Sequence, residues 1–370
     1  METMRGAVFE EPGQPMKIEE LAIDHPHAGE VLVRLAASGI CRSDYHVVVG
    51  EWTAPTPIVL GHEGAGIVEQ VGEGVDTVEV GDHVIMSWVP YCGRCAYCLQ
   101  GRLNLCTLVL ETAYAGVMLD GTTRLRRGDE DVYSYSAVAS FAEYAIVPAT
   151  GAIPIRRDAP LDVAATVGCA VTTGIGAAIN TAGVEPGASV LVIGCGGVGL
   201  STIMGATLVS ALPVIAVDVL DPKLELARRV GATETINAKT TDVLEAVREI
   251  TGGRGVDYAF EAIGGASTIE LAYDALCPGG TAVVVGQVPN NVKASFDPMV
   301  MSDREKRLIG SNYGSSSPPL DFPRIIDLYM AGKVPLDALL SQHVKLEEIN
   351  EAFEEMKRGE LARSIIDYST

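Results

Sequence analysis

The chain has 370 residues, of which 48% are hydrophobic and 20% are charged, and its formal net charge is −21. This composition supports a large folded core, and the length favours two domains over one. The negative charge argues against nucleic acid or an anionic membrane surface as a partner. We find neither an apolar signal segment before the first strand pattern nor an apolar run near the ~20 residues that span a bilayer, so we expect a cytoplasmic protein with no membrane partner.

The first part of the chain, 1 to about 170, is predicted to be mostly β-structure, because short strand-forming runs lie between glycine and proline residues. From about 171 to 312 apolar strands alternate with amphipathic helices, which predicts a doubly wound parallel sheet. Strands are expected at 189–193, 214–217, near 235, and at 256–261, 281–285 and 308–310, with a helix at 222–230. Two more helices are expected in the tail, at 322–330 and 346–357.

Four cysteines at short intervals, Cys92, Cys95, Cys98 and Cys106, form the most specific motif of the chain. Four thiolates can fill the tetrahedral coordination of a structural zinc ion. Two disulfides are the alternative, but such short spacing would strain them, whereas a metal accepts it. We therefore expect a zinc lobe at about 88–110 that holds a loop and leaves no coordination position for a substrate.

A glycine-rich turn follows the first strand of the second region. Its residues, Gly194, Gly196, Gly197, Val198 and Gly199, fit the pattern G-x-G-x-x-G between a strand and a helix. Asp218 ends the next strand, nineteen residues beyond Gly199. Such a turn receives a pyrophosphate at the helix N-terminus, and the carboxylate accepts both ribose hydroxyls of NAD while it repels the 2′-phosphate of NADP. We therefore predict NAD; a glycine-rich turn in an unrelated α/β fold is the alternative.

Three further segments supply a second candidate metal site. The segments 39–46, 61–66 and 168–169 contribute Cys41, His62 and Cys169. Two cysteines and one histidine leave a fourth zinc position open to water or substrate. Each residue alone is weak evidence, because a single cysteine is usually a small buried apolar residue. Six of the eight cysteines are then assigned to zinc, which suits a reducing cytoplasm.

In this combination and order, the motifs resemble those of the zinc-dependent medium-chain alcohol dehydrogenases, and the resemblance covers essentially the whole chain. It implies an α/β protein in which a GroES-like β-barrel catalytic domain, 1–170 and 313–370, surrounds a Rossmann NAD-binding domain, 171–312. It also implies NAD and two zinc ions per chain, one catalytic and one structural. The implied reaction is the reversible oxidation of an alcohol to an aldehyde or ketone.

The resemblance assigns roles to individual residues. Cys41, His62 and Cys169 would hold the catalytic zinc, Asp44 would orient His62, and Glu63 would lie behind the metal. The implied cofactor contacts are Arg42 and Arg363 to the pyrophosphate, Asp218 and Lys223 to the adenosine ribose, Thr173 and Val198 to the nicotinamide ring, and the backbone near Val285, Ser311 and Tyr313 to its carboxamide. Ser43 and His46 would carry the alcohol proton to solvent; a surface imidazole is the alternative for His46.

Two tryptophans fall where members of this family line the substrate pocket. Bulky rings at Trp52 and Trp88 would favour small or flat primary alcohols, although either ring could be ordinary core. A thiol-adduct formaldehyde dehydrogenase shares the scaffold and is the closest alternative. Its glutathione-dependent form uses an acid and an arginine where this chain has Trp52 and Leu110. These residues argue against glutathione as the thiol and leave other small thiols as possible partners of formaldehyde. A non-catalytic dinucleotide-binding protein is a remote alternative, because the ligand set and proton relay are complete.

The segment between Cys106 and Phe141 resembles the extended loop of the dimeric branch of the family, with several additional residues at about 126–135. We leave its conformation open. The resemblance implies a homodimer in which edge strands near 281–311 pair across a two-fold axis.

Overall fold

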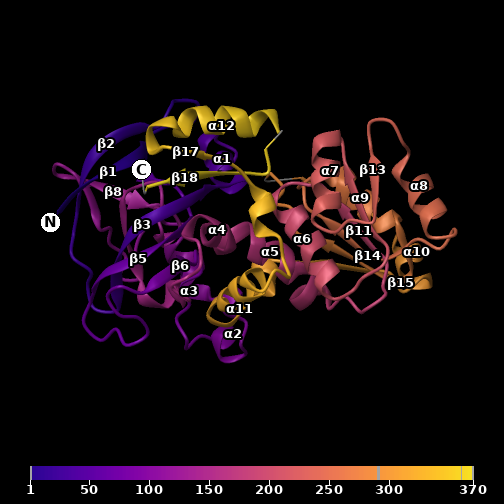
Figure 1. Cartoon of the computed structure of the whole chain (residues 1–370), viewed down its shortest axis with the longest axis horizontal. Helices are drawn as coiled ribbons and strands as arrows, with labels where there is room; N and C mark the ends of the chain where they lie inside the picture. The colour runs from indigo at the N-terminus through magenta and orange to yellow at the C-terminus, as the bar shows by residue number, and fades with distance from the viewer. Residues whose placement is uncertain (1, 290–291, 360, 369–370) are drawn as a thin grey trace. The chain divides into compact units, whose positions relative to one another are not determined.

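The computed structural model describes residues 2–289, 292–359 and 361–368, and every side chain among them except that of Leu110 (Figure 1). These residues form two compact units. The first comprises residues 1–169, 317–331 and 340–370, and the second comprises 170–316 and 332–339. Compared with the division expected from the sequence, residues 313–316 and 332–339 group with the second unit.

The first unit is built on two mostly antiparallel β-structures, in which only β4–β8 and β17–β18 are parallel among the described pairs. The closed barrel runs in the order β1 (Glu2–Phe9), β2 (Lys17–Ile23), β7 (Leu125–Arg127), β8 (Glu130–Ser134) and β4 (Ile58–Val59). The sheet beside it runs in the order β10 (Ala152–Ile155), β6 (His83–Met86), β5 (Glu63–Val71), β3 (Glu30–Ile40), β18 (Arg363–Asp367) and β17 (Leu340–Val344), and β9 (Tyr144–Pro148) also pairs with β3. Strand β3 is buried along most of its length because β5, β9 and β18 all pair with it.

The α-helices of the first unit's described residues are α1 (Arg42–Val48), α2 (Ala96–Leu99), α3 (Thr107–Thr112), α4 (Leu161–Thr166), α11 (Pro318–Met330) and α12 (Ile349–Arg358). Helix α12 packs on β18 through Ile349, Ala352 and Phe353, whose spacing places them on one face (Figure 1). The Phe353 ring lies 6.4 Å from that of Tyr45 and 6.1 Å from that of Phe141. These contacts fix α1, which carries several of the expected site residues.

The second unit contains a six-stranded parallel sheet. Its order is β13 (Glu234–Asn237), β12 (Val214–Asp218), β11 (Val190–Ile193), β14 (Val256–Glu261), β15 (Leu276–Val284) and β16 (Arg307–Gly310). The helices are α5 (Thr172–Gly176), α6 (Gly197–Leu208), α7 (Asp221–Arg229), α8 (Val243–Ile250), α9 (Ala266–Asp274) and α10 (Pro298–Asp303). The strand order reverses between β11 and β14, which is the arrangement of a doubly wound dinucleotide-binding fold. The fold class predicted from the sequence is confirmed.

One expectation about hydropathy is wrong. The helical run Leu161–Ala182, made of α4, α5 and two π-helical turns, is long and apolar enough to cross a membrane by length and composition alone. In the structure, 83% of its most apolar window is buried inside the protein. Its apolar character therefore has an explanation in packing, because a helix covered on all sides is hydrophobic all round.

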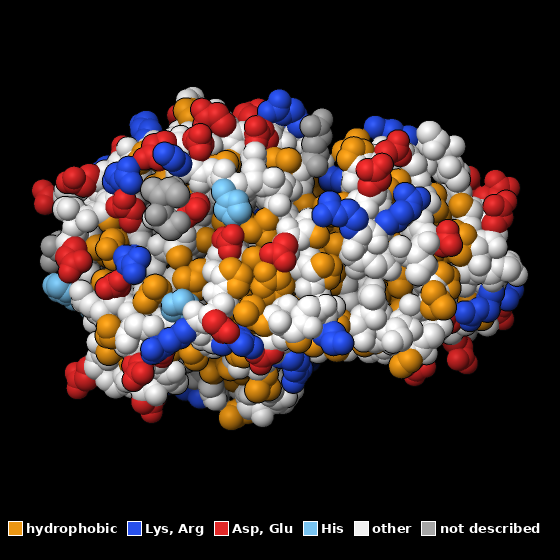
Figure 2. Space-filling model, viewed as in Figure 1, with side chains coloured by type: hydrophobic (Ala, Val, Ile, Leu, Met, Phe, Trp, Pro, Cys, Tyr) orange, Lys and Arg blue, Asp and Glu red, His pale blue; other side chains and the backbone are white. Residues whose placement is uncertain are grey.

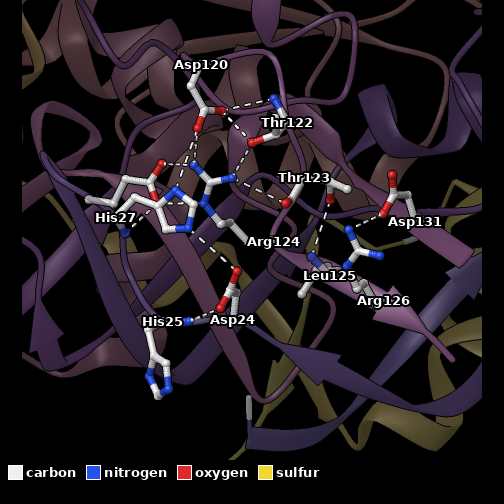
Figure 3. Close-up of polar contacts among 11 residues, drawn as sticks. Asp24, His25, His27, Asp120, Thr122, Thr123, Arg124, Leu125, Arg126 and Asp131 are labelled. Atoms are coloured by element: carbon white, nitrogen blue, oxygen red, sulfur yellow. Dashed lines mark hydrogen bonds and ion pairs between the residues drawn. The ribbon is translucent and has the colours of Figure 1, made fainter. Parts of the chain in front are cut away.

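The long segment after α3 is held by a buried arginine (Figure 3). The guanidinium of Arg124 donates to both carboxylate oxygens of Glu30, at 2.8 and 2.6 Å, and to Asp120 at 2.6 Å. It also donates to the Thr122 hydroxyl and to the carbonyl oxygen of Thr123. The Arg124 side chain is only 2% exposed, so these contacts anchor the segment to the start of β3.

On the outer surface, acidic side chains are scattered among basic ones over the face shown in Figure 2.

Candidate active site

The four cysteines of the 88–110 lobe converge as the spacing predicts. Their sulfur atoms lie within 4.8 Å of one another, and all four are free thiols rather than disulfides. Backbone N–H groups of Cys92, Cys95 and Cys98 donate to the sulfurs of Cys106, Cys92 and Cys95 at 3.3, 3.3 and 3.5 Å. The bond from the Cys98 N–H, with a second from Thr107, lowers the pKa of Cys95 to about 6. The donor set fits a zinc ion with four thiolates, since four such groups repel one another without a cation.

A second cluster brings together Cys41, His62, Glu63 and Cys169, whose ligand atoms also lie within 4.8 Å of one another. All four residues are buried. The hydrogen bond from Cys169 holds the pKa of the Cys41 thiol well below its ordinary value, against the effect of burial. Burial would lower the pKa of His62, but the charges of Asp44 and Cys41 outweigh it and raise this pKa. Two thiols and an imidazole are groups that bind zinc, and these donors fit the catalytic zinc set predicted from the sequence.

Asp44 connects the segments that form this cluster. It lies in the first turn of α1, where Oδ2 accepts the backbone N–H of Cys41 at 3.1 Å. Oδ1 accepts the N–H of Gly61 at 3.2 Å and the Nδ1–H of His62 at 3.0 Å. Because Nδ1 is bound to a carboxylate, the lone pair of His62 that remains for a metal is on Nε2. Cys169 enters from a π-helical turn, Val167–Val171, a feature that often marks functional sites.

Glu63 and Arg363 form a buried ion pair beside the cluster. The Arg363 Nη2 lies 3.5 Å from Glu63 Oε1, and its Nη1 donates to the carbonyl oxygen of Ile40 at 2.8 Å. A Cβ on Gly39 would meet Glu63 Oε2 at 2.1 Å, so the glutamate side chain could not keep this conformation with a larger residue at position 39. The structure thus places Arg363 against the glutamate that the family resemblance puts behind the metal.

The two residues of the predicted relay lie one turn apart on α1. Ser43 is half-buried, while His46 is buried. The Nδ1 of His46 contacts the carboxylate of Glu51, and its ring stacks on Trp52 with centroids 4.7 Å apart. Arg42 is exposed, and its guanidinium lies 4.6 Å from the centroid of the Tyr45 ring.

The predicted dinucleotide turn has the backbone that its glycines require. Gly194 has φ of +97°, and a Cβ on Gly199 would meet the Gly194 carbonyl oxygen at 1.7 Å. A Cβ on Gly196 would meet nothing within 4 Å, so the turn is open at this position. Helix α6 begins at Gly197, which leaves its first N–H groups for an anion. The Asp218 carboxylate accepts from the N–H groups of Cys195, Val219 and Leu220 at 2.8, 2.7 and 3.1 Å.

The other residues of the second unit that are predicted to contact the cofactor lie at the carboxyl edge of its sheet or on helices next to the turn. Val285 follows β15, and Ser311 and Tyr313 follow β16. Lys223 lies in α7, directly after β12. Thr173 and Val198 are on α5 and α6. These helices can approach closely because residue 174 is glycine: a Cβ there would meet the Val198 carbonyl oxygen at 2.3 Å. The carboxyl edge is where doubly wound sheets bind dinucleotides.

The aromatic residues predicted to line the substrate pocket differ in their surroundings. Trp52 stacks on His46, whereas Trp88 packs against a hydrophobic core cluster that contains Val31 and Val84. A residue that the sequence did not single out, Tyr135, lies edge-on to His62 with centroids 5.8 Å apart. Burial and the nearby charges of Asp44 and Cys41 raise its pKa well above the ordinary value.

Tyr135 is held by a strained segment. Ser136, Ala137 and Ala139 all have positive φ, at 56°, 54° and 53°, a conformation that costs energy for residues other than glycine. The N–H of Ser140 donates to the carbonyl oxygen of Gly61 at 3.0 Å, which ties this segment to the residue before His62. No periodic pattern or motif marks it in the sequence, so only the fold reveals it.

Comparison with known proteins adds independent findings. The family model for the alcohol dehydrogenase GroES-like domain matches residues 27–157, and that for zinc-binding dehydrogenases matches residues 197–331. The chain is 38% identical to an S-(hydroxymethyl)glutathione dehydrogenase of Synechocystis sp., over 98% of this chain and 99% of that protein. Two solved structures cover 99% of both chains: an alcohol dehydrogenase zinc-binding domain protein of Burkholderia ambifaria (TM-score 0.96, 38% identity) and the benzyl alcohol dehydrogenase of Acinetobacter calcoaceticus (TM-score 0.95, 35% identity).

Proposed function

Because the chain belongs to the zinc-dependent medium-chain alcohol dehydrogenases, we propose that it oxidises a small or flat primary alcohol to the aldehyde, reversibly and with NAD. The predicted family, enzyme class and cofactor classes, zinc and a nicotinamide dinucleotide, are confirmed. The narrower substrate and the roles of individual residues are the proposal. Its main support is the buried set of Cys41, His62 and Cys169, a ligand set that leaves one zinc position for the alcohol.

The protein's own residues would prepare and deprotonate the alcohol. When bound, zinc supplies the positive charge that makes an alcohol acidic, and NAD accepts the hydride. Asp44 would keep His62 in the tautomer that offers Nε2 to the metal, and the two thiolates would complete the ligand set. Ser43 and His46 would pass the alcohol proton toward water along α1.

The choice of NAD over NADP would rest on Asp218. Its carboxylate is held at the end of β12 by three backbone N–H groups, so it cannot easily turn away from a ligand. A 2′-phosphate at the adenosine ribose would meet this fixed negative charge, whereas two free hydroxyls would donate hydrogen bonds to it. Lys223 on the following helix would bind the same ribose.

Two aromatic rings support a small or flat alcohol. Trp52 is stacked on the proposed relay histidine, and Tyr135 lies edge-on to a proposed zinc ligand. Both are large and conformationally restricted, so a substrate next to them would be narrow or planar. Trp88 packs against the core cluster of the sheet that contains β3, β5 and β6, and we propose it only as a more distant part of the wall.

A thiol-adduct formaldehyde dehydrogenase is the second candidate. It is favoured by the 38% identity to a protein named S-(hydroxymethyl)glutathione dehydrogenase. The presence of Trp52 and Leu110 where the glutathione-dependent form has an acid and an arginine favours other alcohols or other thiols; the Leu110 side chain lies outside the described part of the structure. Assays of formaldehyde with and without glutathione and other small thiols would separate the two candidates.

The proposed function is tested by one assay panel. NADH formation would be followed with ethanol, butanol, hexanol, benzyl alcohol, and formaldehyde plus thiols, before and after treatment with a chelator. Chelator-sensitive oxidation of a primary alcohol would support the proposal, and the order of rates would give the width of the pocket. No turnover of any substrate, with two zinc ions per chain still bound, would favour a non-catalytic dinucleotide-binding protein.

We also propose a cytoplasmic homodimer. Strand β16 pairs only with β15 among the described residues, so its other edge is available for a second copy of β16 across a two-fold axis. A tetramer or monomer by light scattering would contradict the dimer. The eight free thiols suit a reducing compartment, and cell fractionation would test the location.

A further inference from the structure

The relay histidine has a carboxylate partner that the proposed function does not use. Helix α1 ends at Val48, and the chain then turns back at Gly50, whose φ is +78°. The backbone N–H of Trp52 donates to the carbonyl oxygen of His46 at 3.0 Å and closes this turn. As a result, two adjacent residues hold the imidazole: Glu51 contacts its Nδ1, and Trp52 stacks on its face.

The two ends of this contact differ in exposure. The His46 side chain is only 10% exposed, whereas that of Glu51 is 42% exposed. An ionised carboxylate can only accept hydrogen bonds, so Nδ1 must carry the proton in this contact. The neutral imidazole is thereby held in the tautomer whose lone pair is on Nε2, the nitrogen that faces away from Glu51.

We propose that Glu51 is a positioning residue for alcohol oxidation that acts through His46, an inference that rests on the relay in the proposed function. The alcohol gives its hydride to NAD and its proton, through Ser43, to His46 Nε2. Glu51 keeps the Nδ1 proton and balances the charge of the imidazolium that forms. The added proton then passes from Nε2 to water, and the neutral tautomer is restored. The stacked Trp52 ring prevents the imidazole from rotating out of this orientation.

The proposal predicts a specific pattern in a double-mutant cycle. Glu51→Ala should lower the single-turnover rate of NADH formation about ten-fold with little change in the KM for the alcohol, because an orienting carboxylate typically contributes that much. Glu51→Asp should recover part of this loss. In a His46→Gln background, Glu51→Ala should have almost no further effect, because its action passes through the imidazole.

A matched control uses another histidine–carboxylate pair of the same unit, His343 and Asp162. His343 Nε2 lies 3.0 Å from Asp162 Oδ2, and both side chains are partly exposed. Asp162→Asn should leave the single-turnover rate within about two-fold of the wild-type value, since this pair has no place in the relay.

Each result has a distinct meaning. Alcohol turnover by the wild-type enzyme, slow turnover by His46→Gln and an unchanged rate for Glu51→Ala would overturn the role of Glu51 and leave the proposed function intact. Equal losses from Glu51→Ala in both backgrounds would also overturn it, because the residue would then act independently of His46. An unchanged His46→Gln rate would remove the relay and this inference together. Absence of wild-type alcohol turnover would contradict the proposed function itself.

Discussion

Replacement of Arg124 by methionine tests whether one buried arginine stabilises the long segment of the first unit. The methionine is similar in length and apolar, so it fills most of the space but makes none of the hydrogen bonds. The variant leaves the Glu30 carboxylate, whose side chain is 9% exposed, without the guanidinium that faces both of its oxygens. Among the described residues, the Glu30 carboxylate would then keep the hydrogen bond from the backbone N–H of His27, at 3.0 Å.

The expected loss follows from this geometry. Removal of one partner from a buried ion pair costs about 3–5 kcal/mol in free energy of unfolding, because the other charge is left desolvated. The exposed Asp120, whose side chain is 46% exposed, adds little to this figure because water replaces the lost contact. We therefore expect about 3–5 kcal/mol for Arg124→Met, nearly all of it from Glu30.

Urea unfolding followed by tryptophan fluorescence measures this loss in the correct unit. Both tryptophans of the chain, Trp52 and Trp88, belong to the first unit, so the signal does not report on the second. Arg126→Met is the matched control in the same segment, since Arg126 pairs with Asp131 at 3.0 Å but both side chains are about half exposed (Figure 3). This control should cost less than about 1 kcal/mol.

A second variant separates lost charge pairing from lost packing. If the penalty comes from the unpaired carboxylate, Glu30→Gln combined with Arg124→Met should recover a large part of the stability, because no buried charge remains. Equal and small losses for Arg124→Met and Arg126→Met would refute the reasoning. So would a double variant that is less stable than Arg124→Met alone.

Three further predictions concern the metal, the cofactor and pH. Cys98→Ser should remove one of the two zinc ions and lower thermal stability; loss of turnover with unchanged zinc content and stability would contradict a structural role for this site. Asp218→Asn should raise kcat/KM for NADP relative to NAD by about ten-fold or more, and an unchanged ratio would show that this carboxylate does not select the cofactor. The guanidinium of Arg254 holds the pKa of Asp257 well below its usual range, so this ionised pair stabilises the fold above about pH 4 and loses that contribution as the pH falls further. The difference in calorimetric midpoint between Asp257→Asn and the wild type should therefore be largest near neutral pH and shrink below about pH 4; a constant difference would contradict the assignment.

The spacing of residues in the sequence was sufficient to predict the features whose residues lie close together along the chain. The cysteines of the 88–110 lobe meet because a few residues separate each from the next. The turn from Gly194 to Gly199 depends on the positive φ of Gly194 and on the lack of space for a Cβ at Gly199. The alternation of strands and helices after residue 171 likewise gave the sheet, since every strand of β11 to β16 lies within a few residues of its expected place.

Contacts between residues that are far apart in the sequence could not be predicted in the same way. Arg124 and Glu30 are 94 residues apart, and neither belongs to a motif, so the anchoring of the long segment was left open. Tyr135 lies next to His62 only because strained backbone after it is tied to Gly61. We expected no apolar run of membrane-spanning length, but Leu161–Ala182 is one by length and composition alone, and most of its apolar window is buried inside the protein.

The metal cluster shows why family motifs identify this kind of site so well and its surroundings so poorly. Asp44 accepts hydrogen bonds from Cys41, Gly61 and His62, so each of two short motifs carries part of a single rigid network. A change at any of these positions would disturb the geometry of the proposed metal ligands directly. The residues of the network lie in two short segments, so a sequence motif can contain all of them. Tyr135 contacts the cluster through its ring, edge-on to His62, rather than through a shared hydrogen bond, and Trp52 stacks in a similar way on His46. Many side chains of similar size can make such contacts. A short sequence motif therefore does not identify the residues next to the site, and the substrate cannot be predicted from motifs alone.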